Sequence, residues 1–301
     1  MKNKRIIIGI VLIFTLALQI GCSGNGEIPI NDQENGHGKE IMDEFNALVE
    51  NDTELDKVIG FIDQNISALS KENAATMINK LEELQKKNLP KLEEEYYTDS
   101  NLQNKMLHLY QSKFDINEIN NSDDEALKGL LTETKENGYK IETAEGMFFP
   151  IIDYGIYKNY RSYATPDLEH YIDIMVIEST NVPAKDGALV IGWDEVLDRA
   201  MNQEEFMSQY PDSVKIDDVK KLYTKYVGFA LFGLNNTPLF SYDSKTMVEE
   251  AKSVYEEGVK RNEDSEILEI IKEYLDVIEE NDYKLTDEIE TYRRGILENI
   301  G

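Results

Sequence analysis

Apolar residues recur at every third or fourth position along most of this 301-residue chain, and this spacing predicts helices that bury one face. The pattern holds over residues 41–138 and returns over residues 244–301. Between them, residues 139–243 contain five of the seven prolines, the single tryptophan and more than half of the aromatic residues. We therefore expect a mainly α fold of helical hairpins or a bundle, in which residues 41–301 form one compact unit.

Residues 41–138 are the N-terminal helical segment of this prediction. Their apolar stripes indicate several consecutive helices, with a break near Pro90 because proline lacks the N–H group that a helix interior requires. Ser122 and Glu125 have the spacing of a capping box, and Gly138 is typical of a helix stop.

The middle block is predicted to hold the β-structure and the loops. Two β-prone runs flank Gly146 and predict one small hairpin over Tyr139–Ile152. Thr165 followed by Pro166 is typical of a helix start, because threonine can cap free N–H groups there and proline has none to lose. Two long loops are predicted in the rest of the block, TNVPAKDGALVIG and FGLNNTPLFSYDS.

Helical hairpins are repeated in the C-terminal third. The segment EEFMSQYPDSVKIDDVKKLYTKYV predicts two helices around a tight turn at residues 210–213, and VYEEGVKRNEDSEILEIIKEYLDVI repeats this shape about fifty residues later. The YPDS turn and the paired helices resemble the tetratricopeptide repeat over roughly residues 194–300, with a spacing longer than in that family. The resemblance implies stacked helical hairpins, and an ordinary helical bundle explains the same pattern.

The N-terminus has the three parts of a secretory signal peptide. Three basic residues in the first five are followed by the almost wholly apolar run Ile6–Ile20 and then by Gly21 and Cys22. This run is shorter than the roughly 20 residues that a membrane-spanning helix needs. Gly-Cys at this place resembles the lipobox of bacterial lipoproteins, which implies removal of residues 1–21 and attachment of lipid to Cys22.

Residues 22–40 are rich in glycine, asparagine and acidic residues, and they predict a flexible tether. We therefore expect the chain to contact the membrane through its N-terminal lipid, on the outer, extracytoplasmic face of the cell membrane. The composition is similar to that of uncharacterised lipoproteins of Gram-positive bacteria. That resemblance implies a location and no particular activity.

The chain has 59 acidic and 31 basic residues, for a formal net charge of −28. Such a surface repels phosphate backbones, so no nucleic-acid partner is expected. Cationic peptides, divalent cations and neutral glycans are compatible with it, and the partner that we expect is a protein or peptide of the cell envelope. No cofactor motif is evident in the sequence, and no cofactor is expected.

No catalytic motif is evident, so candidate site residues rest on residue type and position alone. Acidic residues at predicted loop or helix ends are candidates for glycoside chemistry, which needs two carboxylates in one cleft. They are Asp153, Glu178, Asp186 and Asp194. The aromatic candidates for ligand binding are Tyr154, Tyr157 and Trp193. The competing interpretation places Trp193 in the core and Asp194 at a helix start.

The segment DLEHYID places two carboxylates and an imidazole within two turns of a predicted helix. Glu169, His170 and Asp173 are therefore weak candidates for metal ligands. Acidic residues are so frequent in this chain that chance spacing explains the group better, and we expect no metal site.

Two functions remain open at this point. We favour a non-enzymatic, lipid-anchored binding or scaffold protein of the cell envelope, on the grounds of the helical hairpins and the tether. The alternative is an envelope hydrolase that acts on wall glycan or peptide through carboxylates of residues 144–243. A solute-binding lipoprotein is a weaker third option, because those proteins alternate strands and helices and this chain has few predicted strands.

Overall fold

The computed structural model describes residues 32–51, 53–98, 100–111, 117–118, 123–261 and 264–300. The predicted signal peptide, the lipidation site Cys22 and Ser122 lie outside the described residues. Within them the chain is mainly α, which confirms the predicted fold class. No helix in these ranges is both long enough and apolar enough to cross a membrane.

Eleven α-helices and three pairs of short strands make up most of the described residues. The helices are α1 (Asp32–Glu50), α2 (Leu55–Asn65), α3 (Lys71–Thr98), α4 (Ser100–Gln111), α5 (Glu125–Glu136), α6 (Pro166–Thr180), α7 (Trp193–Gln209), α8 (Ile216–Phe232), α9 (Glu249–Gly258), α10 (Glu266–Glu280) and α11 (Asp287–Ile300). The strands are β1 (Tyr139–Ala144), β2 (Met147–Ile152), β3 (Ala184–Lys185), β4 (Ala188–Leu189), β5 (Gly233–Leu234) and β6 (Thr237–Pro238). Short 3-10 helices are η1 (Ile66–Ala68), η3 (Ile156–Asn159) and η4 (Arg161–Tyr163).

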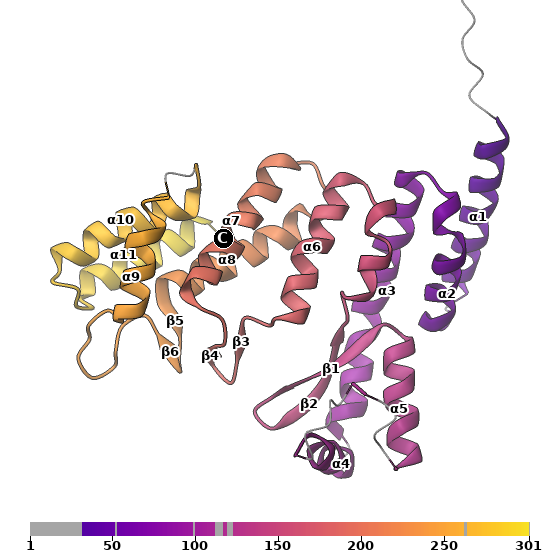
Figure 1. Cartoon of the computed structure of the whole chain (residues 1–301), viewed down its shortest axis with the longest axis horizontal. Helices are drawn as coiled ribbons and strands as arrows, with labels where there is room; N and C mark the ends of the chain where they lie inside the picture. Colours follow the sequence, from indigo (N-terminus) through magenta and orange to yellow (C-terminus); the bar gives the residue numbers. More distant parts are fainter. Residues whose placement is uncertain are drawn as a thin grey trace, which may run out of the picture.

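Figure 1 shows an elongated array of helices, from α1 and α2 at one end, through α3, α6, α7 and α8, to α9, α10 and α11 at the other. The three β-hairpins, with α4 and α5, lie along one edge of the array. The two helix–turn–helix units predicted in the C-terminal third are α7–α8 and α9–α10. Helix α7 packs against α6, α8, α9 and α10, so it is central to the array.

Three clusters of buried apolar side chains hold the array together. The first joins α1, α2, α3 and α6 and reaches α7 and α8, with Phe45, Ile62 and Met77 among its fully buried members. The second joins α7 to α11, and the third lies between the end of α3, α4, α5 and the first hairpin. Met207 of α7 packs against both the first and the second cluster. The two ends of the array are therefore connected through α7.

One predicted helix start is confirmed, and another helix start has a threonine cap. Pro166 is the first residue of α6 and Thr165 precedes it in an extended conformation. Thr286 stands directly before α11, and its hydroxyl accepts a hydrogen bond from the N–H of Ile289 at 3.3 Å.

Two other helix starts differ from the prediction. The predicted tether extends to residue 40, whereas α1 already begins at Asp32. Gly38 is buried beside Leu69 of the first cluster, so packing extends the helix beyond the first apolar stripe. At α5, the N-cap is Asp124 instead of Ser122, and its side chain accepts from the N–H of Leu127 at 3.0 Å.

The predicted break near Pro90 is wrong, because α3 continues through this proline to Thr98. Pro90 is exposed, so the carbonyl group of Lys86 that its missing N–H leaves free can bond to water. Buried residues on both sides of it, Leu81 and Tyr96, hold the helix to the core. Tertiary packing therefore outweighs the local cost of the proline.

The first hairpin forms as predicted. β1 pairs with β2 in an antiparallel register that starts with Tyr139 opposite Ile152. Its two turn residues, Glu145 and Gly146, both have positive φ angles, of 52° and 73°. This is the geometry of a type I′ turn, which matches the twist of the two strands and favours glycine.

The two predicted long loops each contain a further short hairpin, β3–β4 and β5–β6. The β3–β4 turn repeats the geometry of the first, with φ of 52° at Asp186 and 71° at Gly187. The side chain of Asp186 accepts a hydrogen bond from the N–H of Glu145. Its carbonyl group accepts from the Asn236 side chain at 2.5 Å, and the carbonyl of Gly187 accepts from the N–H of Asn236 at 2.8 Å. Asp186 thus connects the tips of all three hairpins.

Candidate functional site

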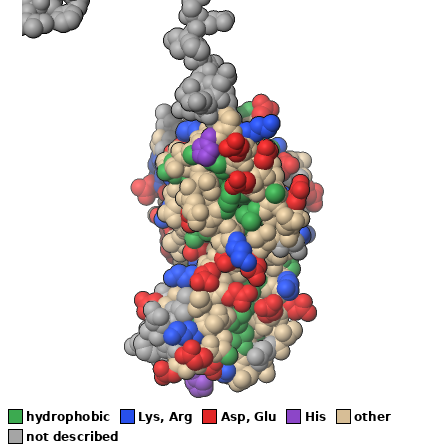
Figure 2. Space-filling model, turned by 90° about the vertical axis from the view of Figure 1, so that its right-hand side faces the viewer, with side chains coloured by type: hydrophobic (Ala, Val, Ile, Leu, Met, Phe, Trp, Pro, Cys, Tyr) green, Lys and Arg blue, Asp and Glu red, His purple; other side chains and the backbone are tan. Residues whose placement is uncertain are grey.

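Exposed acidic side chains occur on helices throughout the array, from α1 to α11. Figure 2 shows acidic side chains scattered over the face at the α1–α2 end of the array, with fewer basic side chains among them. Acidity alone therefore does not mark a functional site in this molecule, and a candidate site needs shape and specific contacts as well.

A groove with a volume of about 970 Å³ runs along α7 and the start of α10. The α7 residues that line it include Asp198, Glu205 and Gln209. Because residues four and seven apart share one face of a helix, these three residues lie on the same side of α7. Arg261 and residues 264–266, which lead into α10, form the other wall.

Carboxylates dominate the charged residues of the groove. These residues are Asp198, Glu204, Glu205, Asp264 and Glu266, with the single basic residue Arg261. Arg261 donates to Asp198 Oδ1 at 2.5 Å and so connects the loop after α9 to α7. Among the described residues, no ion pair neutralises Glu205, Asp264 or Glu266. The groove therefore has a net negative charge.

Glu204 joins the two walls of the groove. Its carboxylate accepts hydrogen bonds from the Tyr223 hydroxyl of α8 and the Ser265 hydroxyl, both at 2.7 Å, and from the N–H of Ile267. Ser265 is the N-cap of α10, where the helix dipole favours a negative charge. These contacts fix the start of α10 against α7, so the groove is formed before any ligand binds.

The groove also has apolar surface, contributed by Met201 and Met207. Its carboxylates are distributed along the walls, and the described residues contain no group of three or more potential metal-binding side chains that could hold an ion. This arrangement suits an extended cationic ligand better than a single metal ion.

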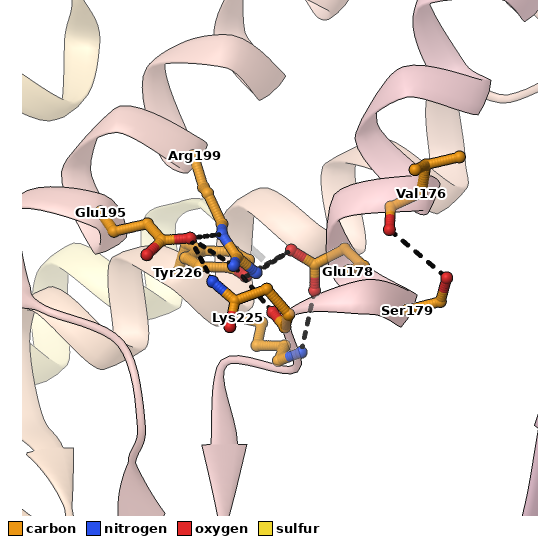
Figure 3. A network of polar contacts seen from close by, with 8 residues as sticks. Val176, Glu178, Ser179, Glu195, Arg199, Lys225 and Tyr226 are labelled. Atoms are coloured by element: carbon orange, nitrogen blue, oxygen red, sulfur yellow. Dashed lines mark hydrogen bonds and ion pairs between the residues drawn. The ribbon is translucent and has the colours of Figure 1, made fainter. Parts of the chain in front are cut away.

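A second polar cluster, shown in Figure 3, is centred on Arg199 of α7. Its guanidinium donates to Glu195 at 2.5 Å, to Glu178 of α6 at 3.1 Å, to the Tyr226 hydroxyl of α8 at 2.9 Å and to the carbonyl of Asn181 at 2.7 Å. Arg199 is only 6% exposed. The cluster therefore joins three consecutive helices in the interior of the array.

Glu178 has both hydrogen-bond donors and basic partners within this cluster. The Tyr226 hydroxyl donates to its carboxylate, and Lys225 approaches it at 3.6 Å. Burial and the nearby charge of Glu178 raise the pKa of Tyr226 above its ordinary value, so this hydroxyl keeps its proton and remains a donor. The Glu178 carboxylate thus has fixed donors from α7 and α8, which is the arrangement of a structural ion pair.

A third polar cluster surrounds Glu82 of α3, which is 2% exposed. Lys215, in the turn between α7 and α8, forms a buried ion pair with it, and Lys86 approaches it at 3.0 Å. The hydroxyls of Tyr154 and Tyr171 donate to the same carboxylate at 2.5 and 2.6 Å. Lys215 also lies 4.9 Å from the ring centre of Tyr171, a distance typical of a cation–π contact.

The protonation state of this cluster follows from its contacts. Burial alone would raise the pKa of Glu82, but attraction to Lys215 and Lys86 and the hydrogen bonds from Lys215 and Tyr154 lower it to about 2. Burial, followed by the charge of Glu82, raises the pKa of Tyr154. The carboxylate therefore stays ionised and the tyrosine stays neutral over the physiological range.

The four carboxylates predicted as catalytic candidates lie on different elements. Asp153 follows β2, where it accepts from the N–H of Gly155 at 2.9 Å. Glu178 is in the Arg199 cluster, and Asp186 connects the hairpin tips. Asp194 is exposed in the first turn of α7, as the competing interpretation expected. Each of the first three has structural hydrogen bonds, and the four do not share one element or loop.

The three aromatic residues predicted as binding candidates are buried. Trp193 is 4% exposed and packs edge-to-face on Tyr255, with 6.0 Å between ring centres. Tyr154 donates to Glu82, and Tyr157 donates to the side chain of Gln85. They pack in the core and offer no open face on which a ligand could stack.

The residues considered as metal ligands take other partners. Arg161 forms a bidentate salt bridge with Asp173, in which both N–O distances are 2.8 Å. It also contacts the carboxylate of Glu169 at 2.6 Å. The Nε2 atom of His170 is instead 2.9 Å from the side-chain oxygen of Asn202 on α7. The imidazole and the carboxylates therefore do not converge.

The groove was not found from the sequence. Its two walls come from α7 and from residues more than fifty positions later, and only the fold brings them together. The spacing of Asp198 and Glu205 on one helix face was visible, but acidic residues share helix faces throughout this chain.

A comparison with known proteins found no matching protein-family model, no matching curated protein and no matching solved structure.

Proposed function

We propose that this chain is a lipid-anchored protein of the cell envelope that binds or scaffolds a partner through its helical array. The N-terminal sequence supports the anchor: a short basic segment, an apolar run of about fifteen residues and the single cysteine, Cys22. Residues 23–31 lie between the lipidated cysteine and α1 in this proposal, and they would connect the array to the membrane.

The observation that carries the binding function is the groove between α7 and the start of α10. It is preformed, because Glu204 bonds both walls, and it is open to solvent along a helix at the centre of the array. Preformed grooves lined by fixed polar groups and adaptable apolar side chains are typical of binding sites.

The hydrolase alternative has weaker support. A glycoside hydrolase needs two carboxylates in one cleft, one of which keeps its proton near neutral pH. Among its candidates, Glu178 accepts hydrogen bonds from Arg199 and Tyr226, and Asp186 connects the hairpin tips. These contacts favour structural roles for both residues.

The anchor is tested by metabolic labelling with a palmitate analogue and by cell fractionation. We expect the wild-type chain to carry the label and to sediment with membranes, and the Cys22→Ser variant to lose the label. A wild-type chain that is unlabelled, or a Cys22→Ser variant that keeps its label, would contradict the anchor.

The binding function is tested separately by photo-crosslinking in cells. A photoreactive amino acid at position 208, in the groove, should trap a specific envelope protein, whereas one at position 279, at the far end of α10, should not. The same crosslinked species from both positions, or none from position 208, would contradict binding through this groove.

A further inference from the structure

We propose that the groove between α7 and α10 binds a basic polypeptide segment, one rich in lysine or arginine with apolar residues between them. This inference rests on the proposed binding function and specifies the chemistry of the partner. It follows from four properties of the groove, namely its charge, its length, its apolar surface and its rigidity.

The charge of the groove determines the sign of the partner's charge. The groove combines five carboxylates with one guanidinium, and Arg261 is already paired with Asp198. In a partly enclosed groove the interaction between opposite charges is screened less than on an open surface. Cationic side chains that enter would find Glu205, Asp264 and Glu266 without a basic partner among the described residues.

Length favours a polymer over a small cation. From Asp198 to Gln209 the wall of α7 extends over about 16 Å at 1.5 Å per residue. An extended polypeptide of about five residues spans this distance at roughly 3.3 Å per residue. A volume of about 970 Å³ has room for such a segment. A single divalent ion would need ligands that converge, and the described residues contain no such group.

Apolar surface favours a polypeptide over a simple polyamine. Met201 and Met207 lie among the polar residues of the groove. Methionine side chains are flexible and polarisable, and they adapt to varied apolar groups in binding sites. The methylene stems of lysine and the side chains of apolar residues between them can contact these methionines while the ammonium groups meet the carboxylates.

Rigidity makes the recognition specific to this place. Glu204 bonds to Tyr223 of α8, to Ser265 and to the start of α10, so the carboxylates on both walls keep a fixed separation. A preorganised site loses less entropy on binding than a site that must be ordered by its ligand. The groove should therefore bind a basic segment more tightly than an equal number of surface carboxylates does.

The test is a titration of the full chain with a fluorescent peptide of alternating lysine and leucine residues. The groove variant is Glu205→Gln with Asp264→Asn, and the matched control is Glu279→Gln with Glu280→Gln, at the exposed far end of α10. Both variants remove two exposed negative charges, so non-specific attraction falls equally. We expect the groove variant to weaken binding about tenfold and the control to weaken it less than about twofold.

Salt and peptide charge complete the test. Binding to the wild type should weaken as ionic strength rises, because the charges involved are partly exposed to solvent. The same peptide with glutamine in place of lysine should not bind. Equal weakening in both variants, or equal binding of the two peptides, overturns the inference.

The outcome can be separated from that of the proposed function. If photo-crosslinking at position 208 traps a partner but the groove and control variants bind the basic peptide equally, the groove binds a partner of other chemistry and this inference alone fails. If lipid labelling fails while the peptide titration succeeds, the anchor fails and the groove chemistry stands.

Discussion

The carboxylate of Glu82 and the carboxylates of the groove lie in opposite surroundings. Glu82 is buried between α3 and the α7–α8 turn, with two lysines and two tyrosine hydroxyls around it. Four of the five groove carboxylates, Asp198, Glu205, Asp264 and Glu266, are exposed, and Arg261 is the single basic residue among the described residues that line the groove. The charge of Glu82 is balanced by basic residues of the fold, whereas the groove leaves negative charge that a partner could balance.

The role of a carboxylate in this molecule therefore follows from its counter-charges more than from its position in a motif. A buried ion with matched donors stabilises the fold and becomes costly when one partner is removed. An exposed ion without a counter-charge contributes little to stability and is available for binding. Each region therefore predicts a different response to the loss of one charge.

The largest effect is expected at Glu82. Glu82→Gln removes the negative charge and leaves Lys215, which is 7% exposed, without its counter-ion. We expect the free energy of unfolding at neutral pH to fall by about 3 to 5 kcal/mol, measured by urea denaturation.

A double variant tests whether the pair is the cause. In Glu82→Gln with Lys215→Met no charge of the pair remains, so the loss should be smaller than the sum of the two single losses by at least about 1 kcal/mol. If the two losses of unfolding free energy are strictly additive, Glu82 and Lys215 do not stabilise each other.

The second effect is a dependence of stability on acid pH. The pKa of Glu82 is lowered from 4.5 to about 2 on folding, so the unfolded chain binds its proton first as the pH falls. This carboxylate contributes stability above about pH 4.5 and loses it between about pH 4.5 and 2, by about 3 kcal/mol. The difference in unfolding free energy between wild type and Glu82→Gln should therefore shrink over this range, and a constant difference would contradict the contribution of Glu82.

The third effect is expected at Arg199, which combines the planar geometry of arginine with burial. Arg199→Lys keeps the charge but cannot maintain the hydrogen bonds to Glu178, Glu195 and Tyr226 together. We expect a loss of about 2 kcal/mol in unfolding free energy. As a control, Lys225→Gln removes the more exposed partner of Glu178 and should cost less than about 0.5 kcal/mol. Similar losses of unfolding free energy in Arg199→Lys and Lys225→Gln would show that burial of the basic residue does not determine its contribution to stability.

The elements of this fold were largely predictable from local patterns. The hairpin over Tyr139–Ile152 and the start of α6 at Pro166 depend on residues close in sequence, and both were predicted. The continuation of α3 through Pro90 was not, because it depends on packing of distant residues against both halves of the helix. The short hairpins β3–β4 and β5–β6 were predicted as loops, since their strands have only two residues each and are supported by contacts between hairpins.

The candidate sites were less predictable than the fold for the same physical reason. Glu82 and Lys215 are 133 positions apart, and no local pattern links them. Trp193, Tyr154 and Tyr157 were visible as aromatic residues, but whether an aromatic side chain is buried or open depends on the whole array. In a chain with 59 acidic residues, a carboxylate at a loop end carries little information until its counter-charges are known.

The smallest effect on stability is expected in the groove. Glu205→Gln with Asp264→Asn removes two exposed charges that have no basic partner among the described residues. We expect the unfolding free energy to change by less than about 0.5 kcal/mol, because the loss of a negative charge beside the N-terminus of α10 and the weaker repulsion between the groove carboxylates oppose each other. Urea denaturation of this variant beside Glu279→Gln with Glu280→Gln measures this change.

A loss above about 1 kcal/mol in the groove variant alone would show that these carboxylates stabilise the fold as Glu82 does. Unchanged stability together with weaker binding of the basic peptide would show that the same residue type stabilises the fold in one region and serves binding in the other.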